Sequence, residues 1–303
     1  MKVNDCLNRI PITVDKKNGR RVKLLVPCGK CEFCLSKRKQ MWTFRLLEEF
    51  KVCDSAYFVT LTYDDHHLPW YSVYSRPFGG RDFYTYSRCE RTDGPCINGV
   101  SKSDVQKFLK RLRKSIEPFK IRYFLVSEYG PETLRPHYHM ILFDFPQSLD
   151  IEKRLNDTWG LGFVSVSPLN EARISYTCKY VLNSLPLDSP LPKNFMLCSK
   201  GIGKSYLNDA NIYYHRSHLQ PYLDYGDHVI PLPRYLVEKI FTYDEIDEFS
   251  KENEKRNLRE WYELREKRSK MSPRARENDY WGFISSQEDA RRRIFKKSKK
   301  STL

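Results

Sequence analysis

The sequence predicts an α+β fold with a helical C-terminal extension. Runs in which β-branched and aromatic residues alternate with others predict strands at residues 56–63, 122–128 and 137–143. Apolar residues at helical spacing predict helices at 103–114 and 170–185. A charged helical stretch occupies roughly 244–270. These three observations place a sheet with helices in the first two thirds of the chain and helices in the last third.

The charge of the chain favours a polyanionic partner. Its 303 residues carry 53 Lys and Arg against 38 Asp and Glu, a formal charge of +15. Basic side chains near phosphates release counterions, and the 14% aromatic content, with 20 Tyr, suits base stacking. A basic protein without such a partner is the plain alternative, but the aromatic content shifts the balance toward nucleic acid.

Membrane insertion and export are not expected. No apolar run approaches the roughly 20 residues that span a bilayer, and the first residues lack the apolar core of a signal peptide. We therefore expect no membrane partner and a cytoplasmic location. Nine cysteines, an odd number, then favour reduced thiols or metal ligation over disulfides.

We predict three parts in the chain. Residues 1–55 form a basic, cysteine-rich region with a candidate hairpin turn at Lys17-Asn18-Gly19 and a helix around Leu46. Residues 56–207 form the central domain, in which the Gly-, Pro- and Asp-rich segment 64–100 is expected to be a loop insertion. Residues 208–303 form a charged helical region that ends in a basic tail.

The first strand and the first helix of the central domain are expected to contact DNA. Thr60 and Thr62 share one face of the strand at 56–63. The pattern Ser103-x-x-Gln106 predicts a capping box at the helix start. Apolar residues of this helix form one stripe, while basic residues cover its outer surface. The basic residues that we expect to lie along a phosphate backbone are Lys107, Lys110 and Arg111.

A metal site is predicted at two histidines of one strand. His137 and His139 are two residues apart, so a strand turns both imidazoles to the same side. Glu128, near the end of the preceding strand, is the nearest carboxylate that could share an ion with them. A histidine pair that only forms hydrogen bonds is the alternative. The other five histidines show no comparable spacing to a carboxylate.

Two tyrosines of the following helix are the candidate nucleophiles. Tyr176 and Tyr180 are four residues apart and therefore share a helix face. The main apolar stripe lies on the other side and comprises Ile174, Cys178, Val181 and Leu185. A phenol with a pKa near 10 is roughly a thousandth ionised at pH 7, so it needs help. Lys179 could supply part of it by favouring the phenolate.

Three closely spaced cysteines could hold a second metal. Cys28, Cys31 and Cys34 supply three thiols, whereas zinc usually takes four ligands. The fourth could come from Cys6, Cys53 or Cys198, and an iron–sulfur cluster or simple reduced thiols remain alternatives. A nucleotide-binding loop at Gly201–Ser205 is rejected, because the Gly five residues before Gly203 is replaced by Cys198.

Several segments resemble one known family. In order, they are similar to the three motifs of the HUH endonucleases that initiate rolling-circle replication: FVTLTYDD (58–65), RPHYHMILF (135–143) and YTCKY (176–180). The closest resemblance is to replication initiators of the Microviridae, small single-stranded DNA phages, especially the gokushovirus branch. Segments that resemble this branch are PCGKCEFC (27–34), DVQKFLKRLRK (104–114), SEYG (127–130) and GIGKSYL (201–207). Ser127 departs from the Gly that family members often have.

The resemblance implies both the fold and the chemistry. It implies an HUH-like antiparallel sheet flanked by helices, with residues 56–207 as the nicking domain. His137, His139 and Glu128 would bind Mg²⁺ or Mn²⁺, and Tyr176 or Tyr180 would attack the origin strand. This attack leaves a 5′-phosphotyrosine and a 3′-OH primer, and the second tyrosine serves in rejoining.

The implied partners are single-stranded and origin double-stranded DNA, with a host helicase and polymerase, in the host bacterial cytoplasm. Two other hypotheses remain. One is a non-catalytic, zinc-stabilised nucleic-acid-binding protein built on the cysteines and the basic helix. The other is a plasmid-type replication protein, relaxase or transposase of the same superfamily.

Overall fold

The computed structural model forms two compact units, residues 43–203 and residues 1–42 with 204–303. It describes residues 6, 10–15, 21–78, 81–90, 96–181, 189–225, 228–270 and 272–274. The predicted turn at Lys17-Asn18-Gly19, the helix beyond Val181 and the basic tail lie outside the described residues.

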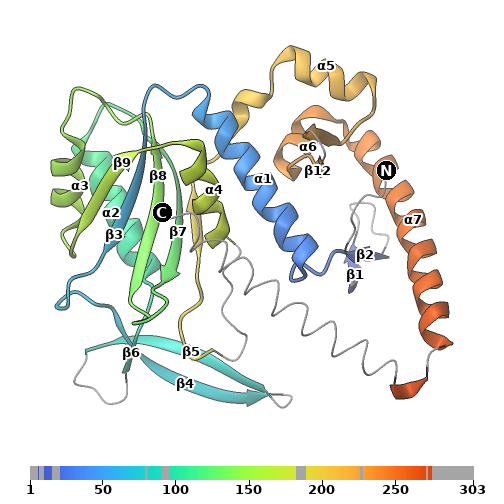
Figure 1. The fold of residues 1–303 in the computed structure, drawn as a ribbon, viewed down its shortest axis with the longest axis horizontal. Coiled ribbons are helices and arrows are strands. Elements are labelled where there is room, and N and C mark those ends of the chain that lie inside the picture. The colour runs from blue at the N-terminus through green and yellow to red at the C-terminus, as the bar shows by residue number, and fades with distance from the viewer. Residues whose placement is uncertain are drawn as a thin grey trace. The chain divides into compact units, whose positions relative to one another are not determined.

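A five-stranded antiparallel sheet forms the centre of the unit 43–203, as the resemblance implied (Figure 1). Its strand order is β10-β7-β8-β3-β9. The strands are β3 (Ala56–Thr62), β7 (Arg122–Tyr129), β8 (Pro136–Phe143), β9 (Val164–Pro168) and β10 (Met196–Cys198). Because β8 lies between β7 and β3, its residues have neighbours on both sides, which confirms the α+β prediction and places the histidines centrally.

Helices cover both faces of this sheet. On one face, α2 (Lys102–Ser115) and α3 (Ile151–Trp159) pack through Phe108, Leu112 and Trp159 against Met140 and Leu142. On the other face, α4 (Glu171–Tyr180) lies over β7 and β8. We call these the core face and the site face. Successive residues of β8 alternate between them, since side chains of a strand point to opposite sides in turn.

The core face contains a small polar network within its apolar packing. The Tyr63 hydroxyl donates to Asp104 at 3.1 Å and lies 2.9 Å from the Tyr138 hydroxyl. The Ser101 amide donates to the Tyr138 hydroxyl at 2.7 Å, and the Ser101 side chain caps α2 by accepting from the Asp104 amide. The capping box predicted at Ser103 is therefore wrong: the helix begins earlier, because Ser101 offers the extended backbone that a cap needs.

The loop predicted at 64–100 is also wrong, because most of this segment is a three-stranded antiparallel sheet. Its strands are β4 (Trp70–Phe78), β5 (Arg81–Cys89) and β6 (Cys96–Asn98), in the order β5-β4-β6. The Gly, Pro and Asp residues suggested a loop, but the tyrosines and Trp70 between them have strong strand preference. The segment remains an insertion between β3 and α2.

The second unit is mixed rather than purely helical. It contains two small antiparallel hairpins, β1 (Ile10–Asp15) with β2 (Arg21–Val26) and β11 (Tyr222–Tyr225) with β12 (His228–Pro231). Its helices are the 3-10 turn η1 (Lys204–Tyr206), α5 (Asp209–Ser217), α6 (Arg234–Ile240) and α7 (Tyr243–Ser269). Helix α1 (Glu32–Phe50) contributes residues to both units.

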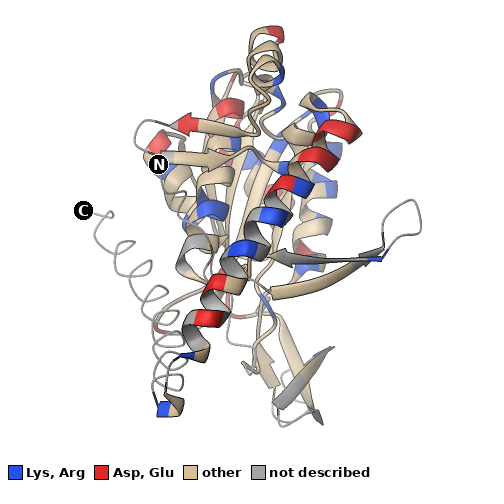
Figure 2. Cartoon of the chain, turned by 90° about the vertical axis from the view of Figure 1, so that its right-hand side faces the viewer, with Lys and Arg blue, Asp and Glu red and all other residues tan. Residues whose placement is uncertain are grey.

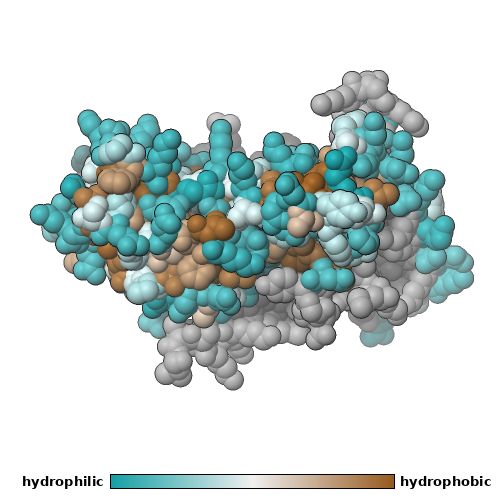
Figure 3. Space-filling model, turned by 90° about the horizontal axis from the view of Figure 1, so that it is seen from above, coloured by the Kyte–Doolittle hydropathy of each residue, from teal (hydrophilic) through white to brown (hydrophobic). Residues whose placement is uncertain are grey.

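Charge follows α7 along its whole length. Acidic and basic residues alternate on it, with acidic ones at its first turns (Figure 2). Lys251 pairs with Asp247 one turn earlier at 2.8 Å, the spacing at which opposite charges meet on a helix. The charged C-terminal helix predicted from the sequence is thus confirmed. Hydrophilic side chains cover most of the face drawn in Figure 3, and no described helix is long and apolar enough to cross a membrane.

The glycine-rich turn 201–203 has a structural role in the sheet unit. The Gly203 amide donates to buried Glu49 at 2.8 Å, and Arg122 also pairs with Glu49 and with the Gly201 carbonyl. Gly203 has φ +77, and a Cβ there would lie 2.9 Å from the Arg45 carbonyl oxygen. The turn amide therefore faces a carboxylate of the protein, which agrees with rejecting a nucleotide-binding loop.

Candidate functional site

Two imidazoles and one carboxylate converge on the site face. In the β7–β8 register, Glu128 lies directly opposite His137, and His139 follows two residues later on the same side. Nε2 of His137 lies 3.0 Å from Oε2 of Glu128, and Nε2 of His139 lies 2.9 Å from the same oxygen. The ligand atoms of all three residues lie within 4.8 Å of one another. This is the donor set expected for a divalent cation bound by nitrogen and oxygen.

The second nitrogen of each imidazole is held by another part of the sheet. Nδ1 of His137 lies 3.2 Å from the Arg135 carbonyl oxygen, and Nδ1 of His139 lies 3.3 Å from the Thr60 hydroxyl. Such contacts orient ligand imidazoles in metal sites, because they fix the ring and leave Nε2 for the metal. The Nε2 atoms of both rings are therefore directed to one point, the Glu128 carboxylate.

The protonation of this group reflects burial and mutual contact. Burial opposes ionisation of Glu128, but hydrogen bonds from His137 and His139 hold its pKa below the ordinary value. For His137, burial acts to lower the pKa, and the hydrogen bond to Glu128 outweighs it, so the pKa is raised. Burial lowers the pKa of His139. An ionised carboxylate between two imidazoles is a site that a cation stabilises.

Both tyrosines of α4 stand beside this group. The Tyr180 ring stacks on the His139 ring at 4.8 Å between centroids, and the Tyr176 ring meets the same imidazole edge-on at 5.8 Å. The two tyrosine rings lie 5.0 Å apart. Phe58 stacks on His139 at 5.5 Å and completes the aromatic wall. The phenols therefore adjoin the candidate metal ligands, on the sheet face opposite the main core.

The helix-wheel prediction for α4 needs one correction. Ile174 and Cys178 are fully buried, as predicted. Tyr180, however, is only 8% exposed, and Thr177 is buried with it. The buried arc of α4 is wider than the predicted stripe because the helix lies flat over β7 and β8, so Tyr180 falls inside its edge and Tyr176 is half-buried.

Neither phenol is activated by its surroundings alone. Burial raises the pKa of Tyr176, and the negative charge of Glu128 adds to this effect. Burial and Glu128 also raise the pKa of Tyr180. The Lys179 ammonium lies over the face of the Tyr176 ring, 5.6 Å from its centroid, so its contact is with the ring. A cation at Glu128 would offset the charge that holds both phenols neutral.

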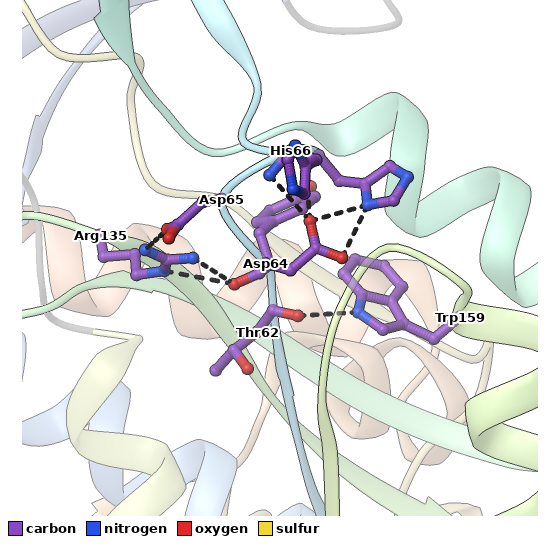
Figure 4. Close-up of polar contacts among 8 residues, drawn as sticks. Thr62, Asp64, Asp65, His66, Arg135 and Trp159 are labelled. Carbon is purple, nitrogen blue, oxygen red and sulfur yellow. Dashed lines mark hydrogen bonds and ion pairs between the residues drawn. The ribbon is translucent and has the colours of Figure 1, made fainter.

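The end of β3 is fastened to the start of β8 by residues that the sequence analysis left without a role (Figure 4). Arg135 donates to the Tyr63 carbonyl at 2.6 Å and to Asp65 at 2.6 Å. Trp159 donates through its indole N–H to the Thr62 carbonyl at 2.9 Å. Arg135 and Asp65 occur inside the quoted motif segments, but only the fold shows that they pair.

Two further details complete this corner. Asp64 accepts from the His66 and His67 amides and pairs with the His67 imidazole at 2.8 Å, so the expectation that His67 lacks a carboxylate at useful spacing is wrong. Gly162 has φ +147, and a Cβ there would lie 2.4 Å from the Thr62 carbonyl oxygen. Only glycine allows this approach of two backbones.

The residues expected to bind DNA fall on different faces. Thr60 lies on the site face beside His139, and the Thr62 hydroxyl donates to the Phe163 carbonyl at 3.3 Å. Lys107 and Lys110 are exposed on α2, which covers the core face. Arg111 donates to the Thr158 and Trp159 carbonyls, which end α3. The structure thus brings Thr60 to the histidines and places the basic helix on the other side of the sheet.

A second ligand group lies in the other unit. The sulfurs of Cys6, Cys28, Cys31 and Cys34 lie within 4.8 Å of one another. Sequence alone left the fourth member open, and the structure supplies Cys6. Cys53 instead donates to the Phe50 carbonyl, and Cys198 lies on β10. The nine cysteines all fall within the described residues, and none of them forms a disulfide.

The comparison with protein families now identifies the sheet unit. Residues 56–185 match the family model of the replication-associated protein ORF2. This segment belongs to that replication-associated protein family. It contains the convergent group Glu128, His137 and His139 and both tyrosines of α4, so every residue of the candidate site lies within the family segment.

Proteins of three bacterial viruses are similar to this chain. Replication-associated protein ORF2 of Spiroplasma virus 4 is 29% identical over 279 residues, which cover 82% of this chain and 74% of that protein. Replication-associated protein ORF4 of Chlamydia phage 1 is 26% identical, over 52% of this chain and 37% of that protein. Replication-associated protein VP4 of Bdellovibrio phage phiMH2K is 25% identical, over 52% and 48%.

The chain thus spans less than half the length of the latter two relatives. No solved structure matches it. The resemblance to replication proteins of the Microviridae, drawn from the motifs, is confirmed by these relatives and by the family segment.

Proposed function

We propose that this chain initiates rolling-circle replication of a small DNA phage by nicking and rejoining the origin strand. The observation that carries the proposal is the convergence of two imidazole Nε2 atoms on one buried carboxylate oxygen, beside two tyrosine rings. The printed names of the relatives, all replication-associated proteins of phages, support the biological role.

The donor set fits a divalent cation. One carboxylate oxygen and two imidazoles, oriented through their second nitrogens, suit Mg²⁺ or Mn²⁺, which prefer oxygen and accept nitrogen ligands. Glu128, His137 and His139 would hold the ion. When bound, it supplies Lewis-acid polarisation of the scissile phosphate.

The protein's own residues then perform the transfer. The phenol oxygen of Tyr176 or Tyr180 forms a bond to phosphorus, and the bond from phosphorus to the 3′ oxygen breaks. The proton that the phenol loses is balanced by the proton that the 3′ oxygen gains, which leaves a 5′-phosphotyrosine and a free 3′-OH. One phosphodiester replaces another, so rejoining by a 3′-OH needs no nucleotide cofactor.

Two adjacent tyrosines suit a reaction with two transfers. After one round of synthesis, the first tyrosine is still attached to DNA, and the second can attack the regenerated origin. The released 3′-OH then attacks the first phosphotyrosine and closes the circle. The 5.0 Å between the two rings lets both serve the same phosphate position. Host helicase and polymerase would act on the opened strand in the bacterial cytoplasm.

A denaturing-gel assay tests the proposal. The protein is incubated with Mn²⁺ and 3′-labelled single-stranded oligonucleotides that tile the genome encoding it. We expect labelled covalent adducts, because the tyrosine stays on the 5′ end of the labelled fragment. The variant Tyr176→Phe with Tyr180→Phe should lose them, whereas Tyr213→Phe, at an exposed tyrosine of α5, should keep them.

Two outcomes would overturn the proposal. Adducts of undiminished yield in the double variant would show that another residue attacks. Binding without adducts across all oligonucleotides would favour a non-catalytic nucleic-acid-binding protein. A plasmid-type relative of the same superfamily is less consistent with the three phage proteins found.

A further inference from the structure

The four-cysteine group has the geometry of a site for a single ion. The Cys31 sulfur lies 3.6 Å from that of Cys6 and 3.5 Å from that of Cys34. Tetrahedral zinc with bonds of about 2.3 Å places its sulfurs about 3.8 Å apart. A four-iron cluster would distribute the thiolates over four metal atoms and separate them further. We propose that one zinc ion is bound by four thiolates, those of Cys6, Cys28, Cys31 and Cys34.

Backbone amides point at these sulfurs, as thiolate ligands require. The Cys31 and Lys30 amides donate to the Cys28 sulfur at 3.3 and 3.5 Å, and the Cys28 amide donates to the Cys6 sulfur at 3.3 Å. Gly29, with φ +71, makes the tight turn between the two cysteines. Such outer contacts offset the charge on ligand sulfur and orient it.

A cation also explains why four thiols are packed together. Cys6 and Cys31 are buried, at 6% and 7% exposed, and burial raises the pKa of the Cys31 thiol to about 11. The Arg38 guanidinium lies 3.7 Å from where a Cβ of Gly29 would be. Its positive charge can offset the net negative charge of zinc with four thiolates.

The zinc would close the base of the β1–β2 hairpin. Cys6 precedes β1, Cys28 follows β2, and Cys34 lies in the first turn of α1. The register pairs Ile10 with Val26 at the open end of the hairpin. A two-stranded hairpin alone is marginally stable in water, and Ile10 is 47% exposed. The ion therefore serves a structural role in a unit separate from the proposed nicking site.

Metal analysis of the purified full-length chain tests this site. After dialysis against a weak chelator that removes Mg²⁺ and Mn²⁺, we expect about one zinc per chain. Cys6→Ser and Cys28→Ser should lower the zinc content several-fold. Cys53→Ser and Cys198→Ser, at cysteines outside the group, should retain it. The nicking assay plays no part in this test.

A second variant and a second metal guard against simple misfolding. Cys6→His should restore zinc binding that Cys6→Ser loses, because three thiolates and one imidazole also bind zinc. The Co²⁺-loaded wild-type chain should show the intense visible bands of tetrahedral thiolate coordination. Zinc content at background, unchanged zinc in Cys6→Ser, stoichiometric iron with sulfide, or disulfides in the freshly purified chain would each overturn the proposal.

Discussion

The two faces of the five-stranded sheet use the same strands for different purposes. On the core face, Tyr138, Met140 and Leu142 are fully buried among apolar side chains of α2 and α3. On the site face, His137 and His139 alternate with them and meet Glu128 across the strand pair. Stability and chemistry are therefore carried by neighbouring residues of one strand.

This difference teaches how a central strand can hold a reactive group rigidly. The imidazoles share their backbone with residues whose packing on the other face fixes the strand. A positioned site of this kind loses activity when a ligand is removed and loses stability when a core neighbour is removed. Substitutions at adjacent positions should therefore separate the two effects.

Removing a candidate ligand should have the largest effect on activity. We expect His139→Ala to lower the rate of adduct formation about 10²–10³-fold, because a divalent cation would lose a ligand and phosphate charge would be less well stabilised. DNA affinity should largely persist. Single-turnover gel assays and filter binding measure the two quantities. Nicking that is unchanged in this variant, with and without chelator, would contradict a metal-dependent site.

The adjacent core-face substitution should show the opposite pattern. Met140→Ala removes a fully buried side chain and should lower the free energy of unfolding by about 2–5 kcal/mol. The folded fraction should still form adducts at a rate within about threefold of wild type. Urea unfolding and single-turnover assays below the transition check this. A loss of activity in fully folded Met140→Ala as large as that of His139→Ala would break the division between the faces.

The polar network of the core face should affect stability to a smaller degree. Tyr63→Phe removes the hydroxyl that donates to Asp104 and contacts Tyr138. We expect a loss of about 1–3 kcal/mol, since two buried polar groups lose a partner, and unchanged nicking. Thermal or urea unfolding measures the loss. A stability equal to wild type would mean that the network contributes nothing.

The basic surface of α2 should have the smallest effect. Lys107→Ala with Lys110→Ala should weaken DNA binding modestly and reduce the slope of log affinity against log salt by about 1–2, as expected for the loss of phosphate contacts. Cleavage of bound DNA should not change, because α2 covers the core face. The charge-conserving Lys107→Arg with Lys110→Arg is the control. Abolished cleavage in the alanine variant would place DNA on the wrong face for this account.

Local patterns in the sequence were sufficient for the centre of the sheet and for much of the site. Alternation marked β3, β7 and β8, and spacing alone put His137 with His139 and Tyr176 with Tyr180. The choice of Glu128 depended on strand pairing that the sequence could only suggest, and the register confirms that it meets both histidines.

Long-range pairing explains what the sequence did not reveal. The contact of Arg135 with Asp65 crosses between β8 and the end of β3, and Cys6 joins the cysteine group across the β1–β2 hairpin. No local pattern indicates which face α2 covers, because its apolar stripe fits either. The strands β4 and β5 were missed since their Gly, Pro and Asp residues outweighed the aromatic signal.

Mapping the DNA-linked residue tests the central claim most directly. Trypsin cleaves after Arg173, Lys179 and Lys193, so Tyr176 and Tyr180 fall on separate peptides. After reaction with Mn²⁺ and cleavable DNA, followed by nuclease and trypsin digestion, mass spectrometry should find the nucleotide mass on peptide 174–179 or 180–193. Nucleotide attached at any of the other tyrosines, or adducts that form equally without a divalent cation, would contradict the account.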